Sequence, residues 1–414
     1  MANITLTPEK MVFGGSCLAK VNGKNVFIPY AIPGEKIEIS IQKSFRDYDI
    51  AKIEKILEPS VHRTLPFCPL YGKCGGCNLQ HIETSFQIEL RKKMLADCFE
   101  REGIKIPEIQ VISGEPKNYR SRIQLTDGGF NERQSNNVLK VDFCPIATGE
   151  INDYLSKVRQ EERPEGRVHF FGDRRIVSST QTEFKNLVIA DETKKDLWTS
   201  RQVGNSRKKA KNRIKQRFAG TLADTRNNCT VCLAGKNIEF DVQGFFQSNL
   251  DVLEKTIGAV TGGLWGDRAL DMYAGAGTFS VFLADIFKKT TLVEHNRDAL
   301  VHAELNLAGK PHETYGLSGS RWVKENAPQI IQKNGLFDAV VIDPPRSGME
   351  KEVCQWLCRT KIPQIRSISC DPSTQARDAA HFIKAGYKLA RLYLLDFYPQ
   401  TAHIESLACL EYEP

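Results

Sequence analysis

The strongest constraint on the fold is an alternation of apolar, strand-like runs with helix-length segments that begins at about residue 236. Four of these runs read ALDMYAG, TTLVEHN, FDAVVIDPPR and IRSISCDP. Strands that are buried on both faces read as continuous apolar runs, and the segments between them are long enough for helical crossovers. The pattern therefore predicts an α/β fold with a parallel sheet covered by helices on both faces.

Polar residues follow these strands at corresponding places. Asp271, Glu294, Asp343 and Cys370 all fall at expected carboxyl ends of strands. In open parallel sheets, ligands bind in the crevice beyond those ends. We therefore expect one crevice to contain all four residues.

The segment LDMYAGAGTFS (270–280) reads as a strand, a glycine-rich turn and a helix start. Gly275 and Gly277 let the backbone approach a ligand closely, and the helix N-terminus favours an anionic group. Ser280 stands where a dinucleotide fingerprint needs its third glycine, so a dinucleotide and S-adenosylmethionine are both open. Glu294 is placed to accept hydrogen bonds from ribose hydroxyls; a surface acid after a core strand is the alternative.

Two further segments are candidates for ligand contacts. In VVIDPPRSGM (340–349), two prolines after Asp343 make a stiff loop that cannot continue the sheet. Such a loop would hold its polar groups rigidly against a planar base. GFFQSN (244–249) precedes the first strand of the sheet, and its Gln247 and Asn249 are candidate ligand contacts, while its phenylalanines suit the core.

Cys370 lies where a strand breaks, in SISCDPSTQARD (367–378). A structural cysteine usually behaves as a small hydrophobe inside an apolar run, whereas a thiol beyond a strand end is placed to attack a bound electrophile. In PQTAHIES, Glu405 is either a general base in the same crevice or a polar residue on the last strand. The spacing alone does not separate these two readings.

Three cysteines within ten residues, Cys68, Cys74 and Cys77, form the pattern FCPLYGKCGGC, and Cys144 follows in DFCPI. This spacing is a strong signal for a metal or cluster site, and zinc and an iron–sulfur cluster are both chemically open. The pairs Cys229/Cys232 and Cys354/Cys358 are more typical of core packing.

The length of the chain and the positions of its turn signals suggest three domains. A chain of 414 residues exceeds one ordinary core. Residues 1–57 have turn signals between short strands and predict an OB-like β-barrel, residues 58–235 a mixed central domain, and residues 236–414 the α/β domain. Taken alone, the basic run RKKAKNRIKQR (207–217) would indicate a solvated helical face. If it lay beside an RNA-binding site, the same run would indicate phosphate binding.

The overall class is a soluble one. The hydrophobic and charged fractions of 41% and 26% are typical of globular proteins. The sequence contains no stretch apolar and long enough for a membrane helix, and its first residues lack the features of a secretory signal. We therefore expect a cytoplasmic protein, without disulfides and without a membrane partner, and take a monomer as the default.

Taken together, these segments resemble the RNA 5-methyluridine methyltransferases that use S-adenosylmethionine. CPLYGKCGGC, GFFQSN, DMYAGAGTFS, IDPPRSG, SCDPSTQARD and PQTAHIES occur in that family's order along the whole chain. The N-terminal segment is similar to the TRAM domain found in such enzymes. The four-cysteine pattern together with the barrel looks most like the bacterial enzymes that act on 23S ribosomal RNA.

The resemblance implies a fold, a reaction and a set of site residues. The fold is a Rossmann-like class I methyltransferase domain with an OB-like barrel and a cluster-binding α+β domain. The reaction is uridine C5 methylation in RNA through a covalent adduct to Cys370, with Glu405 as the base. The implied ligands of a 4Fe–4S cluster are Cys68, Cys74, Cys77 and Cys144, and the implied contacts of S-adenosylmethionine are Gln247, Tyr273, Glu294 and Asp343. The sequence departs from relatives at Thr278, and Ser318 is a weaker candidate for a donor contact.

Three other functions compete with this interpretation. The first is formation of 5-methyluridine in transfer RNA. The second is amine methylation of nucleic acid, which also uses an Asp-Pro-Pro loop but needs no thiol, and whose loop usually ends in an aromatic residue rather than Arg346. The third is a non-catalytic iron–sulfur RNA-binding protein, which would not bind S-adenosylmethionine.

Overall fold

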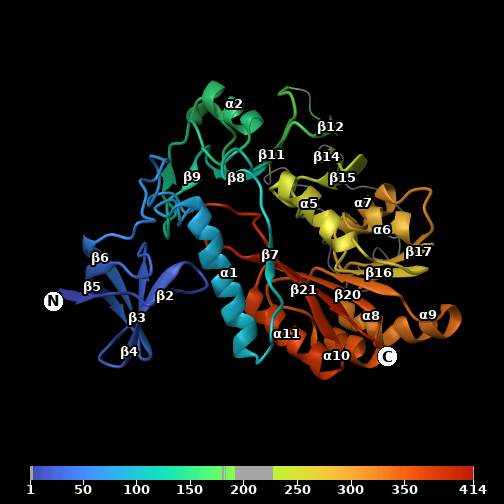
Figure 1. Cartoon of the computed structure of the whole chain (residues 1–414). Coiled ribbons are helices and arrows are strands. Elements are labelled where there is room, and N and C mark those ends of the chain that lie inside the picture. Colours follow the sequence, from blue (N-terminus) through green and yellow to red (C-terminus); the bar gives the residue numbers. More distant parts are fainter. Residues whose placement is uncertain (1–2, 180, 182, 192–226, 414) are drawn as a thin grey trace, which may run out of the picture.

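The computed structural model describes residues 3–179, 181, 183–191 and 227–413 (Figure 1). The basic run 207–217 lies outside the described residues. No helix in the described ranges is long and apolar enough to cross a membrane.

The N-terminal strands form one six-stranded sheet in the order β1-β5-β6-β4-β3-β2, in which only β4 and β6 pair in parallel. Asn22 and Gly23, one of the turn signals in residues 1–57, join β3 to β4, and both residues have the positive φ that a tight hairpin turn requires. The strands are β1 (Ile4–Leu6), β2 (Lys10–Met11), β3 (Ser16–Val21), β4 (Lys24–Pro29), β5 (Lys36–Ser44) and β6 (Tyr48–Glu58).

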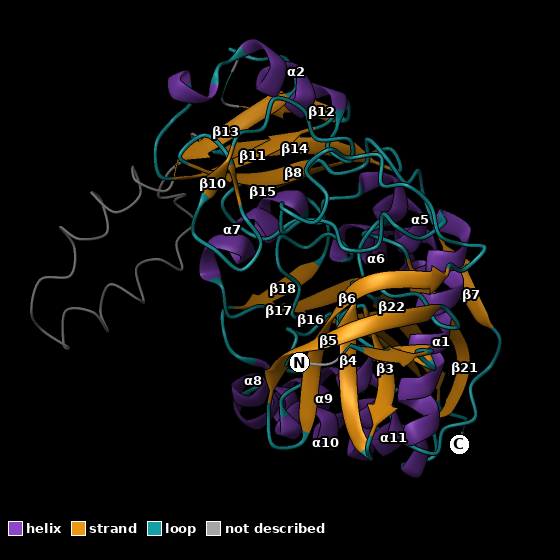
Figure 2. Cartoon of the chain, turned by 90° about the vertical axis from the view of Figure 1, so that its left-hand side faces the viewer, coloured by secondary structure: helices purple, strands orange, loops and turns teal. Residues whose placement is uncertain are grey.

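The middle of the chain forms helix α1, one strand of the large sheet and three small sheets, with the strand orders β13-β11-β8, β12-β14-β15 and β10-β9. Figure 2 shows these small sheets at the end of the molecule away from the N-terminal sheet. The elements are α1 (Thr84–Arg101), β7 (Ile109–Ile112), β8 (Arg122–Thr126), β9 (Phe130–Asn131), β10 (Val138–Leu139), α2 (Gly149–Lys157), the 3₁₀ helix η1 (Gln160–Glu162), β11 (Arg167–Gly172), β12 (Ile176–Ser179), β13 (Leu187–Asp191), β14 (Asn228–Leu233) and β15 (Lys236–Asp241).

The C-terminal part contains an eight-stranded sheet in the order β18-β17-β16-β19-β20-β22-β21-β7. The predicted α/β fold is confirmed. Its elements are α5 (Leu250–Thr261), β16 (Arg268–Met272), α6 (Ser280–Ile286), β17 (Lys289–Val293), α7 (Arg297–Asn306), β18 (His312–Tyr315), α8 (Gly319–Glu325), α9 (Ala327–Asn334), β19 (Ala339–Ile342), α10 (Lys351–Thr360), β20 (Gln364–Ser369), α11 (Pro372–Lys384), β21 (Lys388–Leu395) and β22 (Glu405–Glu411).

Two features of this sheet go beyond the predicted parallel arrangement. Strand β22 is antiparallel to both of its neighbours, β20 and β21. Strand β7, which comes from the middle of the chain, pairs in parallel with β21 and extends the sheet. The sequence indicated a last strand at Glu405 but not its antiparallel direction, and no pattern indicated that β7, from a distant segment, joins this sheet.

Both faces of the sheet are buried, as the continuous apolar runs predict. Along β19 the side chains alternate: Val340 and Ile342 belong to a core with α1, α8, α10 and α11, whereas Ala339 and Val341 belong to a second core with α5 and α6. In Figure 1, α10 and α11 lie on one side of the sheet and α5 and α6 on the other. The core that includes Val340 also takes in buried residues of the N-terminal sheet.

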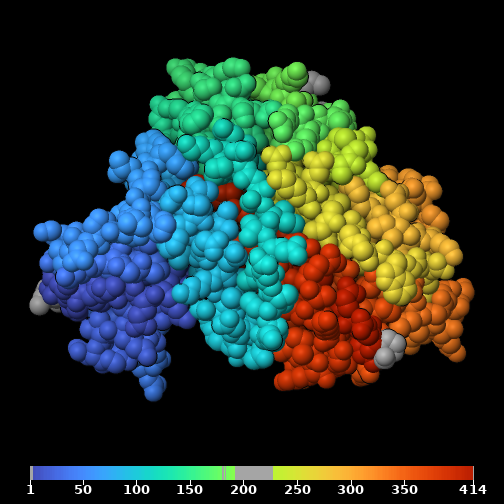
Figure 3. Space-filling view, in the orientation of Figure 1, coloured from blue at the N-terminus to red at the C-terminus, as the bar shows by residue number. Residues whose placement is uncertain are grey.

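The N-terminal sheet approaches the C-terminal part at Gly15. A side chain at this glycine would meet Ala402 at 2.6 Å, and φ is +83°. Asn78 lies beside this contact: its Nδ2 donates to the Gly14 carbonyl (3.4 Å), and its Oδ1 accepts from the Ala402 amide (2.9 Å). Figure 3 shows the coloured segments meeting around a hollow in which C-terminal residues are visible.

Helix α1 is fastened to the sheet by a buried ion pair. Arg91 Nη1 donates to Asp396 Oδ1 at 2.6 Å, and the side chains are 1% and 2% exposed. Because a buried charge left unpaired keeps its desolvation cost, breaking such a pair costs about 3–5 kcal/mol. The pair therefore holds the middle segment against the end of β21.

We expect Asp396→Ala to lower the free energy of unfolding by about 3–5 kcal/mol, because Arg91 would remain buried without its partner. Thermal and urea unfolding followed by circular dichroism would measure the loss. Asp97→Asn, which breaks the more exposed Lys10–Asp97 pair on the same helix, is the matched control and should cost about 0–1 kcal/mol. Equal losses of unfolding free energy in the two variants would contradict the role of the Arg91–Asp396 pair in fastening α1 to the sheet.

Candidate active site

The strand register brings the predicted site residues to one edge of the sheet. Met272 pairs with Val293 and Ile342, and Ile342 pairs with Ser367, so these parallel strands are aligned. Glu294 and Asp343 directly follow β17 and β19, Cys370 follows β20, and Asp271 is the next-to-last residue of β16. These strand ends therefore bring the four residues to one edge of the sheet; that they share one crevice stays a prediction.

Cys370 occupies the step between β20 and α11. Asp371 is the N-cap of α11, and its Oδ1 accepts from the amides of Ser373 (2.9 Å) and Thr374 (3.1 Å), while Pro372 opens the helix. Both residues suit these positions, because an aspartate satisfies free amides and a proline has no amide to satisfy. The Asp-Pro step thus ends the strand and starts the helix, and leaves Cys370 half-buried at the junction.

Glu405 lies next to this junction because β22 runs in the opposite direction. Its first residue is Glu405, and the next, Ser406, pairs with Ser369. Gln247 Nε2 donates to Glu405 Oε2 at 3.5 Å. Glu405 is therefore a buried residue at the start of the last strand, beside Cys370, and its role as a general base stays a prediction.

The electrostatics of these groups are coupled. Burial raises the pKa of Glu405 to about 8, and the nearby Asp343 adds to the rise, while Gln247, Tyr398 and Arg346 oppose it. Burial also raises the pKa of the Cys370 thiol, as do the charges of Glu405 and Asp343, whereas Arg346 lowers it. Glu405, Asp343 and Arg346 are therefore close enough to Cys370 to shift the pKa of its thiol.

A cavity of about 180 Å³ opens at Cys370. Arg346 and His403 line it from the C-terminal part, Asn78 from the cysteine-rich segment and Phe13 from the loop between β2 and β3. The sequence analysis did not identify Phe13 or Asn78, because they lie hundreds of residues from Cys370 and no local pattern marks them. Tyr398, whose hydrogen bond lowers the pKa of Glu405, lies shortly after β21. It was missed because tyrosine is common in cores.

The glycine-rich turn is tied to Glu294. The amide of Gly275 donates to Glu294 Oε2 (3.0 Å), and the amide of Asn296 donates to Oε1 (2.6 Å). A side chain built at Gly275 would meet open space, so the backbone there faces an accessible hollow. Tyr273 has φ of +66°, and its hydroxyl donates to Glu350 (2.7 Å). Burial raises the pKa of Asp343 to about 7.

Gln247 and Asn249 have different roles. Gln247 Oε1 is buried and has no hydrogen-bond partner in the described part of the chain. Buried acceptors normally have a partner, so this oxygen is free to accept a hydrogen bond from a ligand. Asn249 is fully buried and caps α5, with Nδ2 donating to the Phe397 carbonyl (3.3 Å). The candidate contact at Asn249 is therefore wrong. Of the neighbouring phenylalanines, Phe246 is in the core and Phe245 is exposed.

Ser318 caps α8 by accepting from the amide of Arg321 (3.4 Å). Its side chain thus has a structural partner, and its candidacy as a donor contact rests on position alone.

The four predicted cluster ligands line one cavity of about 330 Å³. Cys68, Cys74 and Cys77 come from the segment between β6 and α1, and Cys144 comes from the segment between β10 and α2. Asn152 fixes the second segment, because its Oδ1 accepts from the Cys144 amide (2.8 Å) and its Nδ2 donates back to the Cys144 carbonyl (3.0 Å).

The four thiols are close enough for their charges to affect the pKa of Cys77. Burial raises the pKa of Cys77 to about 12, and the charges of Cys144, Cys74 and Cys68 add to the rise. Within the described ranges, no three His, Cys, Asp or Glu side chains are placed to hold a metal ion. The sulfurs therefore surround a space without converging on one point.

All twelve cysteines lie in the described part and are free, as the expected absence of disulfides requires. Cys229 and Cys232 fall on opposite faces of β14, with Cys229 in the core. Cys354 is buried and Cys358 half-buried on α10. The interpretation of Cys229 and Cys354 as core residues is confirmed.

We expect Glu405→Gln to lower the pH at which Cys370 is alkylated by iodoacetamide. The charge of Glu405 raises the pKa of the thiol, so removal of that charge makes the reactive thiolate available at lower pH. Mass spectrometry of the peptide that contains Cys370, across a pH series, measures the midpoint. The exposed Glu413, exchanged for glutamine, is the control and should leave the midpoint unchanged; an unshifted midpoint in Glu405→Gln would refute the coupling.

The chain was compared with known proteins. The family model of the tRNA (uracil-5-)-methyltransferases matches residues 84–413. An uncharacterised RNA methyltransferase of Treponema denticola is 36% identical over 96% of both chains. The 23S rRNA (uracil(1939)-C(5))-methyltransferase RlmD of Chromohalobacter salexigens is 28% identical over 98% of this chain and 88% of its own.

A solved structure shares the fold along nearly the whole length. It is the tRNA (uracil-54, C5)-methyltransferase of Pyrococcus abyssi in complex with S-adenosyl-L-homocysteine, with a TM-score of 0.70 and 19% identity over 98% of this chain and 100% of that one. At this identity the likeness concerns the fold. Together with the family model and the 36% identical relative, it leads to one conclusion: this chain belongs to the tRNA (uracil-5-)-methyltransferase family.

Proposed function

We propose that this enzyme methylates carbon 5 of a uridine in RNA, with S-adenosylmethionine as donor, through a transient covalent bond to Cys370. The observation that carries the proposal is the pair formed by Cys370 and the buried Glu405 at adjoining strand ends, beside an open cavity. A thiol and a carboxylate in one crevice are the two groups that this chemistry requires. Amine methylation needs neither, and membership in a family of methyltransferases argues against a purely structural RNA-binding protein.

The thiolate of Cys370 adds to carbon 6 of the uracil ring, and the electron pair of the C5–C6 bond moves into the ring as an enolate. Arg346, which lines the cavity, faces the developing negative charge. S-adenosylmethionine, when bound, would supply the methyl group from its positively charged sulfur. Carbon 5 attacks this methyl group, the methyl–sulfur bond breaks, and the neutral thioether S-adenosylhomocysteine is the leaving group. Glu405 then removes the proton from carbon 5, and the returning electrons re-form the double bond and expel the thiolate.

Four residues are proposed to hold the donor. Gln247 offers a buried acceptor without a partner, Glu294 lies under the open backbone at Gly275, and Asp343 presents a buried carboxyl. Tyr273 offers its half-buried ring, since its hydroxyl is bound to Glu350. A buried acceptor and carboxylates suit the cationic and hydroxyl groups of S-adenosylmethionine.

We also propose that Cys68, Cys74, Cys77 and Cys144 hold a 4Fe–4S cluster. The donor set is four thiols around a cavity of about 330 Å³. Four thiolates suit zinc and iron–sulfur chemistry alike, but a single zinc ion needs ligands converging at about 2.3 Å, whereas a cluster fills a larger space. Four thiols around one cavity support a site of this kind, and the resemblance of the four-cysteine pattern to that of the family favours the cluster over zinc.

A bacterial 23S ribosomal RNA is the proposed substrate, because relatives that cover the whole chain carry that activity in their names. The proposed division of labour assigns RNA binding to residues 1–57, as a TRAM-like barrel, cluster and RNA binding to 58–235, and donor binding and catalysis to 236–414. Such an enzyme would work in the cytoplasm as a monomer. Transfer RNA is the alternative, and the same assay on a tRNA transcript separates the two.

We expect Cys370→Ala to lower methyl transfer to a protein-free 23S rRNA transcript at least about 10⁴-fold, with RNA affinity retained, since a nucleophile has no substitute. Glu405→Gln should accumulate a protein–RNA adduct that survives denaturing electrophoresis, because the intermediate cannot lose its C5 proton. Cys358→Ala is the control and should behave as wild type. Release of methylated RNA by Glu405→Gln at the wild-type rate would show that the base is another group.

We expect anaerobically purified protein to contain about four iron and four sulfide per chain, measured by chemical analysis. Cys144→Ser should lose most of this iron, because one of the four thiolates is missing. Cys232→Ser, at a half-buried cysteine on β14, should keep it. Stoichiometric zinc in the wild type, without sulfide, would overturn the assignment of the cluster.

A further inference from the structure

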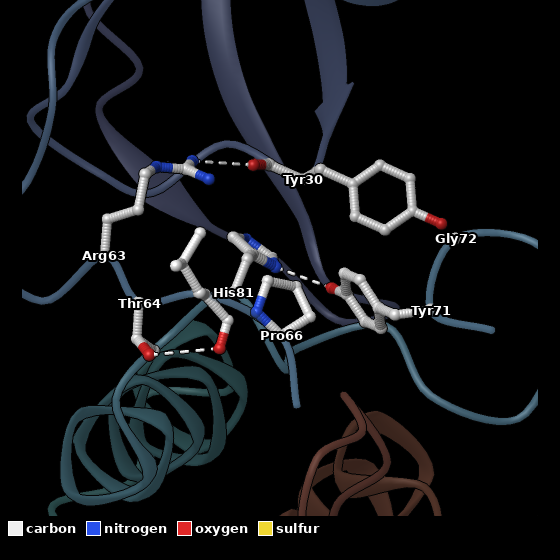
Figure 4. A pocket seen from close by; sticks show the side chains of 8 residues that line it. Tyr30, Arg63, Thr64, Pro66, Tyr71, Gly72 and His81 are labelled. Carbon is white, nitrogen blue, oxygen red and sulfur yellow. Dashed lines mark hydrogen bonds between the residues drawn. The ribbon is translucent and has the colours of Figure 1, made fainter. Parts of the chain in front are cut away.

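A third open cavity, of about 430 Å³, lies between the N-terminal sheet and the segment that carries the cysteines. Its wall includes Tyr30 at the end of β4 and Pro66, Tyr71 and His81 of the cysteine-rich segment (Figure 4). The volume falls in the range of about 300–1,000 Å³ that is typical of pockets for small ligands and groups. Neither Cys370 nor any cluster cysteine lines it.

The aromatic wall is held in place by its own contacts. The ring of Tyr30 lies edge-on to Tyr71 (centroids 5.7 Å apart) and to His81 (5.8 Å), and the hydroxyl of Tyr71 is hydrogen-bonded to His81 Nδ1 (2.7 Å). Tyr30 also has φ of +64°, a conformation that costs about 1–3 kcal/mol for a residue with a side chain and that often marks binding sites. The pocket is therefore preorganised and aromatic.

Positive charge lies beside the pocket. The guanidinium of Arg133, which is not among the lining residues, lies 4.9 Å from the centre of the Tyr30 ring and donates to its hydroxyl. Arg133 has no ion pair with any described carboxylate, whereas Arg63, which lines the pocket, is neutralised by the buried Glu35 (2.7 Å). Leu65, also part of the wall, is 91% exposed. An aromatic pocket with an unpaired arginine beside it suits a nucleobase and its phosphate.

The position of the pocket connects it with the active site. One continuous segment, residues 63–81, contributes to three cavities: Tyr71 lines this pocket and the cysteine cavity, and Asn78 lines the cavity at Cys370. An RNA strand whose uridine enters the cavity at Cys370 can therefore follow this segment to Tyr30.

We propose that the pocket at Tyr30 and Tyr71 receives a second, unpaired base of the RNA whose uridine is methylated, an inference that rests on the proposed function. Stacking binds any base by its π-face and positions the strand, so the contact contributes affinity more than chemistry. Binding of this second base would offset part of the cost of extruding the target uridine.

The test compares Tyr30→Ala with Tyr30→Phe on a protein-free 23S rRNA transcript. The alanine variant should raise KM about tenfold, the loss expected for one stacked base, with kcat unchanged because Tyr30 does not line the cavity at Cys370. The phenylalanine variant keeps the ring and should stay within about twofold of wild type. Trp265→Ala, which removes an exposed aromatic ring that precedes β16 at the opposite edge of the sheet, should change neither constant.

A second readout is independent of turnover. A transcript that contains 4-thiouridine should photo-cross-link to the peptides of Tyr30 or Tyr71 in wild type and lose that cross-link in Tyr30→Ala. Leu65 is exposed, so Leu65→Glu should leave the core intact. It places a negative charge at the opening of the pocket, which would repel RNA, and should therefore also raise KM. If wild type methylates the transcript but the variants keep its KM and no cross-link maps to the pocket, the second-base site is refuted and the proposed function stands. Absence of methylation and of any adduct at Cys370 in wild type would instead refute the proposed function.

Discussion

The geometry of the active site depends on the register between β20 and the antiparallel strand β22. Gln375 of α11 sets this register: its Nε2 donates to the Ser367 carbonyl (2.7 Å), and its Oε1 accepts from the hydroxyl of Ser406 (2.6 Å). All three residues are buried, so these bonds are made away from competing water. A slip of one residue would turn Glu405 to the other face of the sheet and away from Cys370.

The loop between β21 and β22, residues 396–404, joins distant parts of the chain to the active site. Gln87 of α1 donates to Gln400 Oε1 (3.0 Å) and accepts from the Gln400 amide (3.0 Å), while the amides of Asn78 and Leu79 donate to the Gln400 carbonyl. The positive φ of Gln400 directs the loop into this network. The cysteine-rich segment is thereby fixed against the residues that precede Glu405, which explains how one segment lines three cavities.

What the sequence could and could not predict follows from the range of the interactions. Buried parallel strands must be apolar throughout, so the runs before Glu294, Asp343 and Cys370 predicted both the sheet and the residues at its edge. The meeting of Glu405 with Cys370 required the reversed direction of β22, which no local pattern encodes. The placement of Phe13 and Asn78 at the same cavity depends on how separate segments pack. The motifs that the family resemblance supplied identified the pair before its geometry was known.

The charges around Cys370 suit the two steps of the proposed reaction. Asp343 raises the pKa of both Cys370 and Glu405, and Arg346 lowers both. The charge of the ionised Glu405 opposes formation of the thiolate, which is one cause of the raised pKa of Cys370. Addition of the sulfur to the ring removes the charge from the thiolate and relieves Glu405 of that repulsion. A carboxylate whose pKa lies near neutrality can then accept the C5 proton with little penalty, as a general base should.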